Sequence, residues 1–183
     1  MMPVMNERQS KRRALPPMKV FSFFFLLLFG PAYLSAIAQQ SSPCNGDKLA
    51  GVNSRGDQGM GFSHEKTTHH FLLLADGGAI EIQGNEPTDA ASQEAIRGHL
   101  AMIAVKFSQG DFNIPMFIHA TVPPGVETMK RLESKIAYEA GNTERGAQLR
   151  ITTHDTEALT AIHRFLRFQI QDHQTGDSLE VQK

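Results

Sequence analysis

Two pairs of short runs along the chain alternate between hydrophobic and polar residues, as strands with one buried face do. In the first pair, "HHFLLLA" and "AIEIQ" are joined by the turn signal Asp76-Gly77-Gly78, and Ile80 and Ile82 share one face of the second run. In the second pair, "KIAYEA" and "AQLRITT" are joined by the turn-rich "GNTERG". Short Gly-containing connections between β-rich runs are typical of hairpins, so the pattern predicts two of them.

Each predicted hairpin is followed by a helical pattern with a capping residue at its start and a glycine at its end. Asp89 and Asp155 stand at the cap positions, and Gly110 and Gly176 stand at the stop positions. The apolar residues that recur at helical spacing are Ile96, Leu100, Ile103 and Phe107 in the first helix, and Leu159, Ile162, Leu166 and Ile170 in the second.

The two halves of the chain are similar to each other. When residues 95–111 are laid on residues 161–177, identical residues coincide on the buried stripe and at the stop signal. We therefore predict a strand-strand-helix pseudo-repeat with halves at about 67–111 and 134–177. Because neither half can bury its apolar face alone, we predict one α+β domain over 62–177. Its predicted architecture is a two-layer sandwich, a four-stranded antiparallel sheet with two helices on one face.

Other segments lack this regularity. Residues 39–61 are rich in Gly, Ser, Asn, Asp and Gln without an apolar period, which predicts a disordered leader. The connection over 112–134 holds "NIPMFIHATVPP", predicted as extended, and "GVETMKRLESK", predicted as a short amphipathic helix. Because long connections on a rigid scaffold often carry binding sites, we expect function here. Residues 178–183 are predicted to form a tail.

The N-terminus has the features of a secretory signal peptide. Five Lys and Arg residues precede the apolar run "VFSFFFLLLF", and Ala36 and Ala38 occupy the small-residue positions of a cleavage site. The run is shorter than the roughly 20 residues that a membrane-spanning helix needs. We therefore predict a signal peptide at 1–38, a start codon at Met1 or Met18, and a secreted or periplasmic protein without a membrane span after cleavage.

The predicted mature chain is mildly acidic. It holds 13 of the 18 Lys and Arg residues and 18 of the 19 Asp and Glu residues, which gives a net charge of −5. Because no basic stripe remains, the sequence excludes nucleic acid and anionic membranes as partners. Its only cysteine, Cys44, has no partner within the chain, so we expect a free thiol or an intermolecular disulfide.

Sequence motifs point to no catalytic or cofactor-binding residue. The chain has no Gly-rich phosphate loop, no HExxH zinc helix and no paired-cysteine metal site. The stretch "GFSHE" differs from a nucleophile elbow, because Glu65 stands where the second glycine must be.

Histidine and methionine are the residues that suggest chemistry. All 8 histidines lie in the predicted mature chain, and two groups, "MGFSHEKTTHH" and "PMFIH", combine them with methionine. The candidate metal ligands are His64, His69, His70, Met116 and His119. Imidazole and thioether without thiolate suit copper better than structural zinc, so copper or zinc is the expected metal. Because adjacent strand residues face opposite sides, His69 and His70 cannot both bind one ion.

The sequence leaves several functions open. His99 and His173 lie beside the predicted helix stripes, and we interpret them as helix-flank residues. We expect an exported binding domain for a small ligand, a metal ion or a protein partner. One alternative is a homodimeric structural or interaction module that uses a sheet edge or the helix-free face. The other is a small enzyme that uses a pair such as His119 with Asp111 or Glu65.

Three blocks carry a resemblance to known proteins. "MGFSHEKTTHHF", "GDFNIPMFIH" and "AIHRFLRFQIQDHQTGD" resemble blocks of an uncharacterised family of small exported bacterial proteins, sometimes labelled aspartate carbamoyltransferase. That enzyme is a two-domain cytoplasmic protein with a Ser-Thr-Arg-Thr phosphate loop, and this sequence has no such loop to hold carbamoyl phosphate. The resemblance therefore implies an exported protein and transfers no catalytic residue.

Overall fold

The computed structural model describes residues 45–182 of the chain. The predicted signal peptide, the first residues of the predicted leader and Cys44 lie outside this range. Among the helices within it, none combines the length and the apolar composition that crossing a membrane requires.

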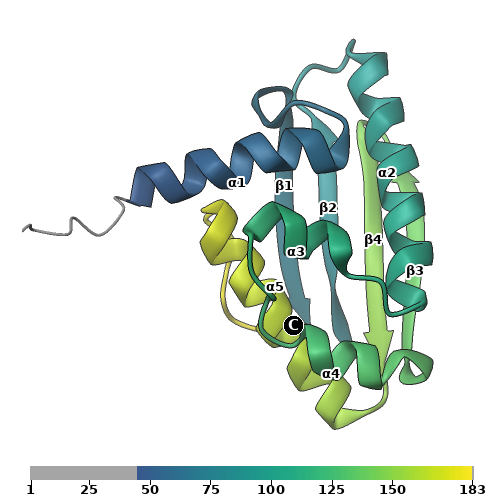
Figure 1. Cartoon of the computed structure of the whole chain (residues 1–183). Helices are drawn as coiled ribbons and strands as arrows, with labels where there is room; N and C mark the ends of the chain where they lie inside the picture. The colour runs from purple at the N-terminus through teal and green to yellow at the C-terminus, as the bar shows by residue number, and fades with distance from the viewer. Residues whose placement is uncertain (1–44, 183) are drawn as a thin grey trace, which may run out of the picture. The chain divides into compact units, whose positions relative to one another are not determined.

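A four-stranded antiparallel sheet and a set of helices make up the described chain (Figure 1). In chain order, the elements are α1 (Asn45–Met60), the 3₁₀ turn η1 (His64–Lys66), β1 (Thr67–Leu74), β2 (Gly77–Gly84), α2 (Ala90–Ser108), α3 (Asn113–His119), α4 (Val126–Arg131), the 3₁₀ turn η2 (Glu133–Lys135), β3 (Ile136–Thr143), β4 (Gly146–Thr153) and α5 (Thr156–His173). The strand order is β1-β2-β4-β3, so each hairpin supplies one central and one edge strand. The predicted α+β class, with its four-stranded antiparallel sheet, is confirmed.

The alternation along the strands sorts side chains onto the two faces of the sheet. Ile80 of β2 lies opposite Phe71 of β1 and Leu149 of β4, and all three are buried. Gly78 belongs to the same face, where an added Cβ would lie 2.1 Å from the side chain of Leu166 in α5. Helix α5 therefore packs directly on this face, and a side chain larger than hydrogen would displace it.

The helices α2 and α5 begin where their capping residues predict. Asp89 and Asp155 each accept hydrogen bonds from backbone N–H groups of the following turn. Gly110 follows α2 with a φ of 70°, as expected for a glycine at a helix end. Helix α5 ends before Gly176, because Gln174 already takes the left-handed conformation with a φ of 53°.

The predicted disorder of residues 39–61 is wrong for Asn45–Met60, which form α1. Contacts with the rest of the fold supply the order: Val52 is fully buried, and Nε of Arg55 donates to the carbonyl oxygen of Ile118 in α3 at 2.7 Å. The helix has few apolar residues and no clear stripe, so its own sequence gives little helical signal. Tertiary packing decides such cases.

The prediction of an extended segment after Phe112 is also wrong. Asn113–His119 form α3, which tolerates Pro115 because this residue lies in the first helical turn, where no backbone N–H donor is needed. The short helix predicted after it is confirmed as α4. Just before α4, Gly125 has a φ of 95°, and a Cβ there would lie 2.2 Å from the carbonyl oxygen of Ala161. The pseudo-repeat and the two-layer arrangement stay predictions, since α1, α3 and α4 fall outside the repeating pattern.

The residues after α5 run beside the outer edge of β1. Asp177 accepts a hydrogen bond from the backbone N–H of Phe71 at 2.9 Å, and the N–H of Gln182 donates to the carbonyl oxygen of Leu73 at 2.8 Å. The segment predicted as a tail is therefore held against the sheet over part of its length.

The burial of Val52 predicts how α1 can be released. Val52→Asp should remove amide-exchange protection from Asn45–Met60 and leave the sheet protected, because a carboxylate at this position must reach water. Hydrogen exchange followed by mass spectrometry measures both segments at once.

The matched control is Ser54→Asp, which adds the same charge at an exposed position of the same helix. It should leave the protection of α1 unchanged. Equal protection of α1 in the two variants would contradict the packing described here.

Candidate functional site

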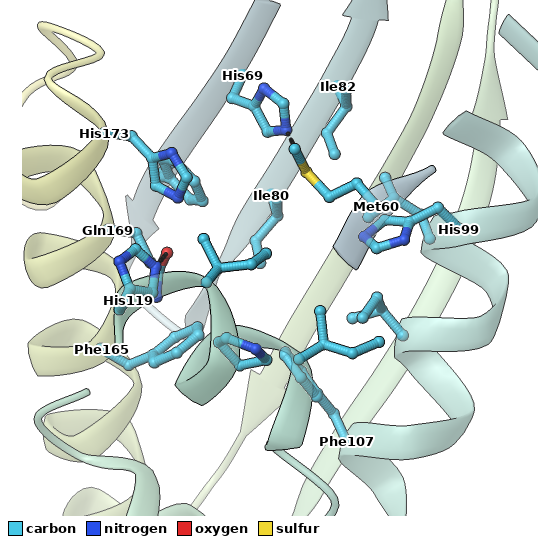
Figure 2. A pocket seen from close by; sticks show the side chains of 16 residues that line it. Met60, His69, Ile80, Ile82, His99, Phe107, His119, Phe165, Gln169 and His173 are labelled. Carbon is cyan, nitrogen blue, oxygen red and sulfur yellow. Dashed lines mark hydrogen bonds between the residues drawn. The ribbon is translucent and has the colours of Figure 1, made fainter. Parts of the chain in front are cut away.

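A small cavity of about 60 Å³ lies between the sheet and the helices that cover it (Figure 2). Its apolar lining consists of Phe71, Ile80 and Ile82 from the sheet, Leu100, Ile103 and Phe107 from α2, Ile114, Pro115 and Ile118 from α3, and Phe165 from α5. The polar lining consists of His69, His99, His119, Gln169 and His173, and Met60 adds a sulfur atom. The inner cavity is therefore an apolar space with imidazole rings in its wall.

A second hollow, of about 250 Å³, lies along α1. Met60, His69 and His173 border both this outer groove and the inner cavity. We call these three residues the partition. Because methionine is unbranched and flexible, Met60 is the member of the partition that can move most easily.

The strand register separates the two adjacent histidines. His69 points to the helix-covered face, where its Nε2 lies 3.3 Å from Sδ of Met60, within hydrogen-bonding range for sulfur. His70 points the other way, and its Nδ1 donates to the Asp177 carboxylate at 2.9 Å. The two side chains therefore face opposite sides of the sheet, as expected for adjacent strand residues, and the one at the cavity is His69.

A buried ionic network lies beside the cavity. Nδ1 of His119 donates to Oδ2 of Asp172 at 2.6 Å, and the two side chains are only 1% and 2% exposed. Lys48 of α1 forms an ion pair with the other oxygen of Asp172. Burial alone would raise the pKa of Asp172, but the hydrogen bonds from Lys48 and His119 outweigh it and hold this pKa below its ordinary value. The charge of the carboxylate is thus fully paired.

His173 lies between His69 and His119. Its ring is parallel to that of His69, with centroids 5.9 Å apart, and edge-on to that of His119, with centroids 4.9 Å apart. Burial lowers the pKa of His173 to about 3, and the charge of His119 acts in the same direction. Burial likewise lowers the pKa of His69 and of His99 to about 4 each. At neutral pH these three rings are uncharged and keep a free lone pair.

Two buried polar atoms in the cavity wall have no hydrogen-bond partner among the described residues. They are Nδ1 of His99 and Nε2 of Gln169. The Oε1 atom of the same glutamine lies 2.8 Å from Nε2 of His119, and the amide nitrogen has no partner among the described residues. Buried polar groups normally have partners, and such an unpaired donor beside a cavity points to a group that enters the cavity.

The five residues predicted as metal ligands do not gather at one point. His69 and His119 line the inner cavity, while His64 lies at the outer groove with its Nδ1 bonded to Asp57 at 3.0 Å. His70 faces the opposite side of the sheet, and Met116 of α3 packs against the core. Within residues 45–182, no group of three His, Cys, Asp or Glu side chains is placed to hold a metal ion.

His99 and His173, interpreted from the sequence as helix-flank residues, both line the inner cavity from their helices. The spacing in α5 carried a signal for this: Phe165, Gln169 and His173 recur every four residues and lie on one helix face. The prediction that pairs His119 with Asp111 is also corrected. The carboxylate bonded to His119 is that of Asp172, whereas Asp111 accepts a hydrogen bond from Lys106 at 2.8 Å.

Comparisons with known protein families, with curated proteins and with solved structures found no match for this chain. The functional conclusion therefore depends on the geometry of the site.

The lowered histidine pKa values predict how stability depends on pH. Between pH 6.5 and about 4, His69, His99 and His173 bind protons when the chain is unfolded but not when it is folded. The free energy of unfolding should therefore fall as the pH is lowered through this window, by up to about 1.4 kcal/mol per pH unit for each histidine. Urea unfolding at several pH values measures the slope.

His173→Gln should reduce this slope by up to about 1.4 kcal/mol per pH unit, because one fewer proton is taken up on unfolding. The control is His154→Gln, at an exposed position, which should leave the slope as it is. A stability that stays constant from pH 7 to pH 4.5 would contradict the uncharged state of the three rings.

Proposed function

We propose that this domain binds a small, uncharged ligand with an apolar ring or chain and at least one hydrogen-bond acceptor in the inner cavity. The unpaired Nε2 of Gln169 carries the proposal, because it is a buried donor that faces an apolar space. Small-molecule sites commonly combine an apolar lining with a few polar groups in fixed positions. Here Gln169 supplies a donor, and His99 supplies a second polar atom.

The charge of the wall favours an uncharged ligand. His69, His99 and His173 are neutral at pH 7, as their lowered pKa values imply. The ionic groups nearby, Lys48, His119 and Asp172, already contact one another. An ionic ligand would lose its hydration without gaining an opposite charge, which costs several kcal/mol.

The size of the cavity limits the ligand to a small one. A volume of about 60 Å³ is less than the engineered 150 Å³ cavity that holds one benzene molecule. Displacement of the Met60 side chain would join the inner cavity to the outer groove and admit a single ring. The ligand would then enter across the partition, between α1 and the sheet.

The predicted signal peptide agrees with this function, since it would deliver the domain to a compartment where small molecules arrive from outside the cell. The enzyme alternative has less support. A general base needs a free nitrogen that faces its substrate, and both ring nitrogens of His119 are occupied, by Asp172 and by Gln169.

Benzyl alcohol is a suitable probe, because its ring matches the lining and its hydroxyl oxygen can accept from Gln169. We expect a Kd on the order of 10⁻⁴ M, with toluene and benzylammonium binding more weakly. Titration followed by NMR chemical shifts would detect binding at the cavity residues.

The matched variants are Gln169→Leu and Gln171→Leu, two positions on the same helix of which only the first is buried. Gln169→Leu should weaken benzyl alcohol about three- to tenfold and leave toluene unchanged, as expected for one lost hydrogen bond. Gln171→Leu should change neither. Shifts confined to surface residues, or equal affinities of both probes in all variants, would refute the proposal.

A further inference from the structure

One ring nitrogen of His119 carries a proton that its partner fixes. Nδ1 lies 2.6 Å from Oδ2 of Asp172, and both side chains are buried. Although burial acts in the opposite direction, the hydrogen bonds from Lys48 and His119 keep the pKa of Asp172 below its ordinary value. The carboxylate is therefore ionised and can only accept a hydrogen bond. Nδ1 thus carries a proton in both the charged and the neutral ring, and these two forms differ at Nε2 alone.

The partner of Nε2 can match either form of the ring. Nε2 lies 2.8 Å from Oε1 of Gln169, and Figure 2 shows the amide reaching the ring. An amide has an acceptor on one side and donors on the other, in groups of nearly equal size. Beside a protonated Nε2, the oxygen faces the ring and the N–H₂ group faces the cavity. Beside an unprotonated Nε2, the N–H₂ group donates to the ring and the oxygen faces the cavity.

We infer that the proton on Nε2 of His119 decides whether Gln169 offers the inner cavity a hydrogen-bond donor or an acceptor. The site then takes ligands that accept when the ring is charged, and ligands that donate when the ring is neutral. The structure has the arrangement of the charged ring, with the amide nitrogen unpaired among the described residues. The inference rests on the proposed function, because it requires that the ligand enters the inner cavity.

The turn of the amide follows from the cost of the alternative. If the ring lost its proton and the amide stayed in place, two acceptors would face each other at 2.8 Å in a buried site. Unmatched buried polar groups are costly, and rotation of the amide about its last side-chain bond removes the mismatch. Gln169 is therefore the residue that touches the ligand, and His119 is a positioning residue that acts through it.

The charged and titratable groups around His119 come from α1, α5 and β1. They are Lys48 and Arg55 of α1, Asp172 and His173 of α5, and His69 of β1. The carboxylate of Asp172 favours the charged ring. Lys48 opposes it, but its side chain is 59% exposed, so water screens its charge. Burial lowers the pKa of His69 to about 4 and that of His173 to about 3, so neither ring gains a proton above pH 5.

Proton binding and ligand binding should be linked, because both act on the same amide. A ligand that accepts from Gln169 should favour the charged ring, and a ligand that donates should favour the neutral ring. An accepting ligand that binds to the neutral form should therefore take up one proton from the solvent.

NMR of the ligand-free protein tests the coupling between the two side chains. With ¹⁵N-labelled histidine and glutamine, a titration from pH 5 to pH 10 should show that Nδ1 of His119 stays protonated while Nε2 loses its proton. The side-chain amide resonances of Gln169 should shift with the same midpoint, and those of Gln171, which is exposed, should not. An amide of Gln169 that does not follow the ring would overturn the inference.

Two probes test the effect on the ligand. Benzonitrile accepts a hydrogen bond and donates none, whereas pyrrole donates one from its N–H group. As the pH rises through the transition of His119, the ratio of the two affinities should change about tenfold or more in favour of pyrrole. Toluene should bind equally on both sides of the transition. A constant ratio with both probes bound would overturn the inference, whereas the failure of all three probes to bind would refute the proposed function instead.

Gln169→Glu removes the choice, because a carboxylate can only accept. In this variant Nε2 of His119 should keep its proton to a higher pH than in the parent, and the ratio of the two affinities should no longer change at the parent's midpoint. Gln171→Glu is the matched control, since it adds the same charge at an exposed position of the same helix. It should keep the pH dependence of the parent. Equal pH dependence in the two variants would contradict the role of Gln169.

Discussion

The buried carboxylate of Asp172 is the group on which the helical side of this protein depends. It lies on α5 and is bonded to Lys48 of α1 and to His119 at the end of α3. A buried carboxylate that loses its partners is strongly destabilising, so the three helices must come together for the fold to close. The same contacts hold α1 and α3 against α5 and fix His119 in the wall of the cavity. One charge thus links the order of the N-terminal helix to the shape of the site.

Much of the fold could be predicted because it is encoded locally. The hairpins follow from period-two alternation, and α2 and α5 follow from their capping aspartates and apolar stripes. The helices α1 and α3 could not be predicted in this way. The order of α1 comes from Val52, Arg55 and Lys48, whose partners lie far along the chain, and α3 carries a proline that suggested an extended segment.

The candidate site was predicted only in part for the same reason. His69 and His119 stood out in the sequence, and both line the cavity. Their neighbours Gln169 and Asp172 are 50 and 53 residues from His119, and nothing in the sequence indicates that they meet. The adjacent positions of His69 and His70 suggested a shared role, but β1 directs their side chains to opposite faces of the sheet. The cavity wall combines imidazoles from four different elements.

The segment after α5 has a consequence for how copies of this chain can associate. By hydrogen bonding to Phe71 and Leu73, it occupies part of the edge that β1 would otherwise offer to another strand. Edge-to-edge growth into a filament needs two free edges on each molecule, and among residues 45–182 no segment is recorded along the β3 edge. A dimer in which β3 of one copy pairs with β3 of the other would leave neither copy with a free β3 edge for a third copy. The arrangement of the described strands thus favours pairing over filament growth, if copies of this chain associate by strand addition.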